Sequence, residues 1–260
     1  MLENQSIIVT GAAGGIGQAI ARRLLDQGAK LALFERNEAL CETARQGLPI
    51  NADVIYIAAD LGEPQAIEQG VAKAAAHMGS ITGLVNNAAI LCSDDSDPCT
   101  TSLESFEKTL QINVTGAFLM CKHVLPHMMA NGGSIVTLSS VVAHAASATP
   151  QIAYTTSKGA LEAMTREIAI AYARHNIRAN SVAPGPVRTE RTAHYFDTEE
   201  KWEKRRRHIP AGRLGQTKEV AALVAYLLGP DAAYMTGGVY PIDGGISAAY
   251  VVDDTIIPKE

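Results

Sequence analysis

The chain has 260 residues, of which 47% are hydrophobic, and it carries a formal net charge of −5. This length and apolar content predict one large core within a single α/β domain, residues 1–260. The negative charge argues against a nucleic-acid partner. The one basic run, Lys204 to Arg207, lies beside three glutamates and indicates mainly a solvated helix face.

Neither a membrane segment nor a metal site is indicated. No apolar run reaches about 18 residues and the first residues show no basic leader, so we expect no membrane association. The four cysteines, Cys41, Cys92, Cys99 and Cys121, form no CxxC pair and share no histidine-rich ligand spacing. They predict reduced thiols in a cytoplasmic protein without a bound metal.

Short apolar, β-branched runs alternate with longer helical patterns along the chain. In chain order, strands are predicted at 7–10, 31–34, 54–58, 83–86, 134–138, 178–182 and 239–242. Helices are predicted between them at 16–27, 38–46, 65–77, 103–129, 152–173 and 218–228. This alternation favours a doubly wound, mostly parallel, seven-stranded sheet with helices on both faces.

One long stretch, 184–216, has no strand pattern. A long irregular stretch inside a compact domain is usually functional, so residues 186–215 are predicted to form a substrate-binding loop or lid. The aromatic residues between 191 and 202 fit either a mobile lid or a loop packed onto the domain.

A glycine-rich segment, Thr10 to Gly17, joins the first predicted strand to the first predicted helix. Glycines at positions 11, 15 and 17 permit a tight turn, a close approach of backbone to a pyrophosphate, and a helix N-terminus aimed at its negative charge. This placement indicates a dinucleotide site, with a plain flexible turn as the alternative.

Glu35 ends the second predicted strand, 18 residues after Gly17, where an acidic residue meets the adenosine ribose in dinucleotide-binding folds. A carboxylate there accepts hydrogen bonds from two ribose hydroxyls and repels a 2′-phosphate, which favours NAD and disfavours NADP. Arg36 complicates this, because its guanidinium can pair with that phosphate or stack on adenine. Asp60 is placed either to cap the adenine amino group or to serve as a turn or N-cap residue.

Tyr154 and Lys158 lie four residues apart in a predicted helix, after Ser139 and Ser140. Residues at i and i+4 share a helix face. A cation about 4 Å from a phenol, at an effective dielectric of ~20, is worth roughly 4 kcal/mol or about 3 pKa units, which brings the phenol toward its working range as a proton-transfer group. Taken alone, the pair also fits a solvated helix face.

In order and spacing, these motifs resemble the short-chain dehydrogenase/reductase family of the single-domain Tyr-x-x-x-Lys type. The matching residues are Thr10-Gly11-x-x-x-Gly15-x-Gly17, Asp60-Leu61, Asn86-Asn87-Ala88, Asn113, Ser140, Tyr154-x-x-x-Lys158, Pro184-Gly185 with Thr189, and Asp243-Gly244-Gly245. The resemblance covers Ser6 to about Gly245 and implies a single-domain Rossmann fold. Two departures are Ala89, where the family has glycine, and a longer Ser140 to Tyr154 separation, which implies a remodelled loop over 144–151.

The resemblance implies hydride transfer between a nicotinamide and a carbinol or carbonyl carbon. Tyr154 would be the general acid/base, Ser140 would orient the reacting oxygen, and Lys158 would bind the nicotinamide ribose and lower the tyrosine pKa. Asn113 would hold a water in a proton relay. The expected cofactor-binding residues are Gly11, Gly14, Gly15, Ile16, Gly17, Glu35, Arg36, Asp60, Leu61, Asn87, Ala88, Tyr154, Lys158, Pro184, Gly185, Val187 and Thr189. The expected substrate-binding residues are Ser140, Val142, His144, Gln151, Tyr154 and Gly185.

Three of these assignments have structural alternatives. A buried amide at Asn113 needs partners or costs about 1 to 3 kcal/mol, and either a helix-kinking water network or neighbouring backbone would satisfy it. Asn86 and Asn87 also fit strand-end turns. His144 fits either a substrate contact or an exposed loop histidine.

The residues favour an NAD-dependent dehydrogenase acting on a small or cyclic, largely apolar secondary alcohol or ketone. The alternatives are an NADPH-dependent reductase of 3-oxoacyl thioesters or ketones and, more remotely, a non-catalytic dinucleotide sensor. The resemblance also predicts a homotetramer, with the apolar tail at 246–260 in a subunit interface.

Overall fold

A computed structural model describes residues 2–147 and 149–249 of the chain. Its main sheet contains seven strands in the order β3-β2-β1-β4-β5-β6-β9. Their bounds are β1 Ser6–Thr10, β2 Lys30–Glu35, β3 Val54–Ala58, β4 Gly83–Asn86, β5 Gly133–Leu138, β6 Ile177–Pro184 and β9 Val239–Ile242. Each pair of neighbours is parallel. The predicted doubly wound parallel sheet is therefore confirmed.

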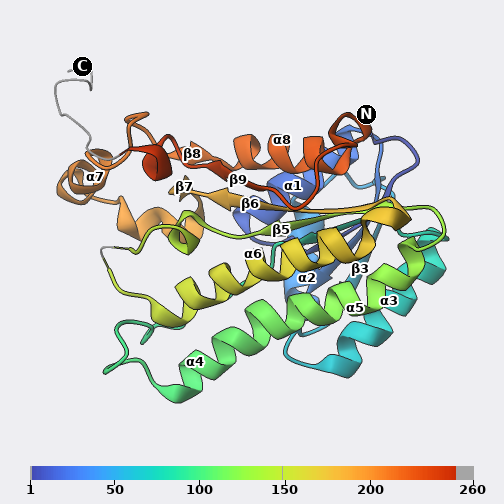
Figure 1. The fold of residues 1–260 in the computed structure, drawn as a ribbon, viewed down its shortest axis with the longest axis horizontal. Coiled ribbons are helices and arrows are strands. Elements are labelled where there is room, and N and C mark those ends of the chain that lie inside the picture. The colour runs from blue at the N-terminus through green and yellow to red at the C-terminus, as the bar shows by residue number, and fades with distance from the viewer. Residues whose placement is uncertain (1, 148, 250–260) are drawn as a thin grey trace.

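Helices cover both faces of the sheet, because successive strand residues point to opposite sides. Ile7 and Val9 of β1 pack in a core with α1 (Gly15–Asp26) and α8 (Thr217–Leu228). Ile8, between them, belongs to a second core with α3 (Pro64–Met78) and α5 (Ala117–Met128). Figure 1 shows α8 above the sheet, with α5 and α6 (Ile152–Tyr172) below it. The remaining sheet-flanking helix is α2 (Glu38–Gln46).

The predicted continuous helix over 103–129 is wrong in its middle. The structure has α4 (Leu103–Leu110), a π-helical segment η1 (Gln111–Gly116) and then α5. A Cβ on Gly116 would lie 2.9 Å from the carbonyl oxygen of Leu61, so the chain passes close to neighbouring backbone here. The wider π turn carries Asn113 inward, and such turns are frequent at functional sites.

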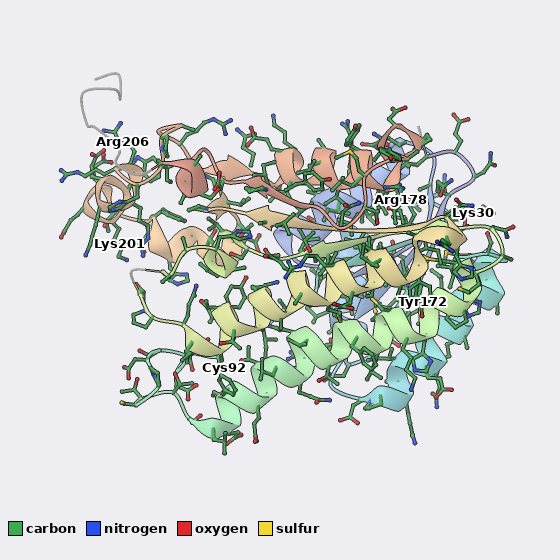
Figure 2. All side chains as sticks on the ribbon, in the orientation of Figure 1. Lys30, Cys92, Tyr172, Arg178, Lys201 and Arg206 are labelled. Atoms are coloured by element: carbon green, nitrogen blue, oxygen red, sulfur yellow. The ribbon has the colours of Figure 1, made fainter. Side chains whose placement is uncertain are left out.

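The stretch predicted to have no strand contains two short ones, β7 (Val187–Arg188) and β8 (Gly215–Gln216), and the helical segments η4 (Glu190–Tyr195) and α7 (Glu199–Arg206). Thr189 and Thr198 cap the two helical segments with their side chains, and β7 pairs with β8. The basic run lies at the end of α7, with Arg207 as its C-cap residue, and Figure 2 shows Lys201 and Arg206 on this helix.

The other short helical turns are η2 (Val141–Ala143), η3 (Ala173–His175), η5 (Pro230–Ala232) and η6 (Ile246–Ala248). In the part of the chain that the structure describes, no helix combines the length and apolarity needed to cross a membrane. All four cysteines are free thiols. Most of the predicted interface tail, from residue 250 onward, lies outside the described residues.

Candidate active site

The strand order of the sheet reverses between β1 and β4, which opens a crevice beyond their carboxyl ends. The glycine-rich segment follows β1 at this edge, and Ser140 follows β5. Pro184 ends β6. Segments far apart in the sequence are thus brought to one edge by the parallel topology.

The glycine loop is held by Asn87. Its Nδ2 donates to the carbonyl oxygens of Thr10 and Gly11, both at 2.9 Å. Gly11 has φ +70°, and a Cβ on Gly17 would lie 2.0 Å from the oxygen of Gly11, so neither position accepts a side chain without rearrangement. A Cβ on Gly11 would also lie 2.9 Å from Cα of Ala88. The side chain of Asn87 thus braces the glycine loop, and its contact with a cofactor stays a prediction.

The N-terminus of α1 suits an anionic group. Its N-cap, Gly14, provides no side-chain cap, and the first turn, which contains Gly15, Ile16 and Gly17, has no acidic residue. An anion there would accept hydrogen bonds from the first N–H groups of the helix, which have no acceptor within it, and would lie at the positive end of the helix dipole. A Cβ on Gly15 would lie 3.1 Å from Cγ2 of Thr189, so this predicted cofactor residue lies against the loop. The residues present therefore fit a dinucleotide pyrophosphate.

Glu35 faces the same loop. It is 7% exposed, and its Oε1 accepts a hydrogen bond from the backbone N–H of Ala13 at 2.5 Å. Burial raises the pKa of the Glu35 carboxyl, and the hydrogen bond from Ala13 opposes this rise only in part. Arg36 beside it is exposed.

Asp60 takes part in a turn. Its Oδ1 accepts a hydrogen bond from the N–H of Gly62 at 2.9 Å, as its structural alternative expects. Leu61 between them is buried, with 8% of its surface exposed. The adenine contact of Asp60 stays a prediction.

Tyr154 and Lys158 share one face of α6, as their spacing predicts. Lys158 is only 2% exposed, and its Nζ donates to the carbonyl oxygen of Leu138 at 2.7 Å. The same Nζ lies 5.4 Å from the centre of the Tyr154 ring. The lysine is therefore a buried cation between the end of β5 and the phenol, not part of a solvated helix face.

Asn113 is buried, and its side chain bonds to protein groups. Oδ1 accepts from the N–H of Ile90 at 2.8 Å, and Nδ2 donates to the oxygen of Ile90 and to Oγ of Ser157, both at 3.0 Å. The Ser157 hydroxyl donates in turn to the oxygen of Tyr154 at 2.7 Å. The amide thus joins the chain after β4 to α6, as its backbone alternative expects. Its proton-relay role stays a prediction.

The remaining predicted residues lie around this centre. Ser140 caps η2, with its Oγ accepting from the N–H of Val142 at 3.4 Å, and Gln151 is the N-cap residue of α6. The N–H of Gly185 donates to Ile242 at 3.1 Å. Val187 is buried in β7, with 4% of its surface exposed.

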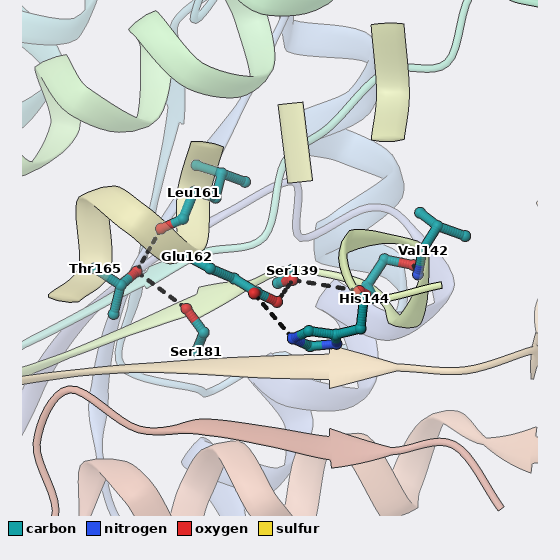
Figure 3. Close-up of polar contacts among 8 residues, drawn as sticks. Ser139, Val142, His144, Leu161, Glu162, Thr165 and Ser181 are labelled. Atoms are coloured by element: carbon teal, nitrogen blue, oxygen red, sulfur yellow. Dashed lines mark hydrogen bonds and ion pairs between the residues drawn. The ribbon is translucent and has the colours of Figure 1, made fainter. Parts of the chain in front are cut away.

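Two carboxylates at the site were missed by the sequence reasoning. Asp95 accepts hydrogen bonds from the N–H groups of Ala153 and Tyr154, both at 2.9 Å. Glu162 is buried and pairs with Ser139 and with His144, whose Nε2 lies 3.0 Å from Oε2 of the glutamate (Figure 3). The sequence held a signal for Glu162, because its i+4 spacing places it on the same helix face as Lys158. It held none for Asp95, because the cap that Asp95 makes depends on tertiary structure alone.

Comparisons with known proteins show which family the chain resembles. A family model described as enoyl-(acyl carrier protein) reductase matches residues 11–247. The 2-(R)-hydroxypropyl-CoM dehydrogenase of Xanthobacter autotrophicus is 37% identical, over 93% of this chain and 98% of its own. The crystal structure of levodione reductase has a TM-score of 0.88 and 32% identity, over 96% of this chain and 100% of that one. RhlG of Pseudomonas aeruginosa, solved as an active-site complex with NADP, has a TM-score of 0.88 and 31% identity, over 95% of this chain and 97% of that one.

The chain belongs to the short-chain dehydrogenase/reductase family. The family resemblance and the Rossmann fold predicted from the motifs are thereby confirmed. This short-chain dehydrogenase/reductase is an oxidoreductase, and its family uses NAD or NADP as cofactor.

Proposed function

We propose that the enzyme transfers a hydride between NAD and a secondary alcohol or ketone that is small or cyclic and largely apolar, with Tyr154 as general acid/base. The observation that carries this proposal is the buried cation of Lys158, 5.4 Å from the Tyr154 ring. A desolvated cation at that position favours negative charge on the phenol, as proton abstraction from an alcohol requires.

In this mechanism, Tyr154 takes the hydroxyl proton of the alcohol, or returns it to a ketone oxygen. Ser140, at the end of β5, donates a hydrogen bond to the same oxygen and orients it. Lys158 is held by Leu138 and stabilises the tyrosinate. The bound nicotinamide supplies the hydride acceptor or donor. The glycine loop would hold the pyrophosphate of the cofactor, and Gly185, Val187 and Thr189 would hold the nicotinamide beside this centre.

The preference for NAD rests on Glu35. Its carboxylate, at the end of β2, accepts a hydrogen bond from the N–H of Ala13 in the glycine loop and would oppose a 2′-phosphate there. The loop from Gly11 to Gly17 carries no basic residue that would compensate for such a phosphate.

An NADPH-dependent reductase of ketones or 3-oxoacyl thioesters is the second candidate. The exposed guanidinium of Arg36 beside Glu35 and the NADP complex of the relative RhlG favour it. The names of the relatives support both directions, since one is a dehydrogenase and another a reductase.

The deciding experiment is a panel of secondary alcohols and ketones assayed with both cofactors, following absorbance of the reduced nicotinamide. NAD-linked oxidation of an alcohol supports the first proposal, and NADPH-linked reduction alone supports the second. Cofactor binding without turnover on any substrate would point to a dinucleotide sensor.

We also propose that the enzyme assembles as a homotetramer through α5 and α6. Phe118 is 51% exposed and Ile170 is 77% exposed on these helices. A groove lies between α5 and α6, and it is lined by Phe118, Cys121, Lys122, Leu125, Pro126, Met129, Met164, Glu167, Ile168 and Tyr172. Large apolar side chains gathered at one surface are typical of a protein contact.

A further inference from the structure

Glu162 is a buried carboxylate outside every motif that identifies the family. It lies on α6, one helical turn beyond Lys158, and is 5% exposed. Its Oε1 accepts a hydrogen bond from the Ser139 hydroxyl, and its Oε2 lies 3.0 Å from Nε2 of His144. Figure 3 shows the carboxylate between these two side chains. Each oxygen therefore has its own donor.

The two donors stand at opposite ends of the turn that carries Ser140. Ser139 precedes Ser140, and His144 follows η2. Within the turn, the N–H groups of His144 and Ala145 donate to the oxygen of Val141, both at 3.0 Å. One carboxylate on α6 thus holds both ends of an internally bonded turn.

Lys158 makes the matching contact one residue earlier on β5, where its Nζ donates to Leu138. The two charged side chains lie on one face of α6 and hold successive residues at the end of the strand, Leu138 and then Ser139. Because α6 also carries Tyr154, these contacts fix where the Ser140 turn lies relative to the phenol.

The chemistry of the contact requires a carboxylate. Burying a charge is costly unless donors replace the lost water, and here two donors do so. A glutamine of the same shape has one acceptor oxygen, so its NH₂ group would face one of the two donors. An apolar side chain would fill the space but remove the carboxylate from both donors, and would leave the Ser139 hydroxyl only the oxygen of Ser140, at 3.4 Å.

We propose that Glu162 is a positioning residue, which clamps Ser139 and His144 to α6 and thereby sets the place of the Ser140 hydroxyl relative to Tyr154. The inference rests on the proposed function, in which Ser140 and Tyr154 act on the same substrate oxygen. Glu162 does not touch that oxygen and acts only through the turn.

The test compares Glu162→Gln and Glu162→Met with Glu68→Gln, a matched change at an exposed glutamate on α3. Because a misplacement of about 1 Å can cost on the order of 10²-fold in rate, we expect kcat to fall about tenfold in Glu162→Gln and about a hundredfold in Glu162→Met. The dissociation constant for the cofactor should stay within about twofold, since the glycine loop is untouched. Glu68→Gln should leave kcat at the wild-type value.

A second readout separates positioning from folding. With an alcohol deuterated at its carbinol carbon, the kinetic isotope effect on kcat should rise in both Glu162 variants, because a misplaced Ser140 slows the chemical step. A lowered melting temperature with wild-type kcat and isotope effect would show a structural role and overturn the proposal. If Glu162→Met does not fold, the proposal is tested instead with Ser139→Ala and His144→Asn, which each remove one donor to Glu162. A wild-type kcat in both of these variants would overturn the proposal. A wild type inactive on every alcohol and ketone with either cofactor would instead contradict the proposed function.

Discussion

Lys158 shows how burial strengthens the interaction between a lysine and a tyrosine that lie four residues apart on a helix, which is a common spacing. Many lysines lie four residues from a tyrosine on solvated helices, where water screens their charge. Here the ammonium donates a hydrogen bond to the oxygen of Leu138 and lies over the Tyr154 ring, and only 2% of the lysine surface is exposed. Its field on the phenol is therefore stronger than that of a surface lysine.

The role of Tyr154 can be tested by removing its hydroxyl. Acid/base groups contribute about 10²- to 10⁴-fold, so Tyr154→Phe should lose at least about 10²-fold in kcat and keep its affinity for NAD. Tyr226→Phe on α8, which removes the hydroxyl of a tyrosine that is 44% exposed, is the control. Retention of more than about a tenth of the activity by Tyr154→Phe would contradict the assigned role.

Cofactor choice should depend on Glu35. A carboxylate at the ribose binds NAD and repels a 2′-phosphate, while Arg36 recovers part of the affinity for NADP. We therefore expect an NAD preference of about 10²-fold or more in kcat/KM and not total exclusion of NADP. Glu35→Ser should relax or invert the ratio. Because Glu35 also bonds to Ala13, the substitution can weaken both cofactors, so the measurement is the ratio of kcat/KM values with one alcohol. A wild type that prefers NADP would favour the reductase.

The raised pKa of Glu35 also predicts a pH dependence. The folded protein favours the protonated carboxyl, so the contribution of Glu35 to stability falls as pH rises through its raised pKa. In the proposed role the ionised carboxylate binds the ribose of NAD, so affinity for NAD should fall as pH is lowered through that pKa, at a higher pH than for an ordinary glutamate. Titration calorimetry between about pH 5 and 8 should show this slope in the wild type and a flatter profile in Glu35→Gln. Equal slopes would show that another group titrates.

Among the elements, α6 depends on a distant loop for its start. Its N-cap residue, Gln151, makes no side-chain cap. Instead, Asp95 accepts from the N–H groups of Ala153 and Tyr154, and the oxygen of Ser96 accepts from the N–H of Ile152 at 3.0 Å. The loop after β4 thus fixes the turn of α6 that holds the phenol.

Asp95→Ala should therefore affect both stability and catalysis. Loss of a helix cap costs about 0.5 to 2 kcal/mol, and freeing the first turn of α6 should also lower kcat. The matched control is Asp94→Ala, because the neighbouring carboxylate bonds to Ser102 and Ser105 at the start of α4. Thermal unfolding and kcat of both variants check this. Equal kcat in the two would show that the cap only stabilises the helix.

At the scale of the whole molecule, the exposed apolar face of α5 and α6 predicts assembly. Ile170→Asp should lower the mass measured by light scattering from that of a tetramer, because a charge in an apolar contact is costly to bury. Ile50→Asp is the control, since Ile50 is fully exposed outside these helices, at 101%. A wild type that is monomeric, or an Ile170→Asp variant with unchanged mass, would contradict the interface.

The sequence by itself determined the sheet and the order of the chemical groups along it. Short-range periodicity predicts each strand of the seven-stranded sheet and most helices, and local spacing indicates the glycine loop, Glu35 and the Tyr154–Lys158 pair. Only the tertiary structure decided four other features: the π segment at Asn113, the turn role of Asp60, and the buried contacts of Asp95 and Glu162. A polar side chain's partner comes from another element, and whether a charge is solvated or buried is settled only when those elements pack together.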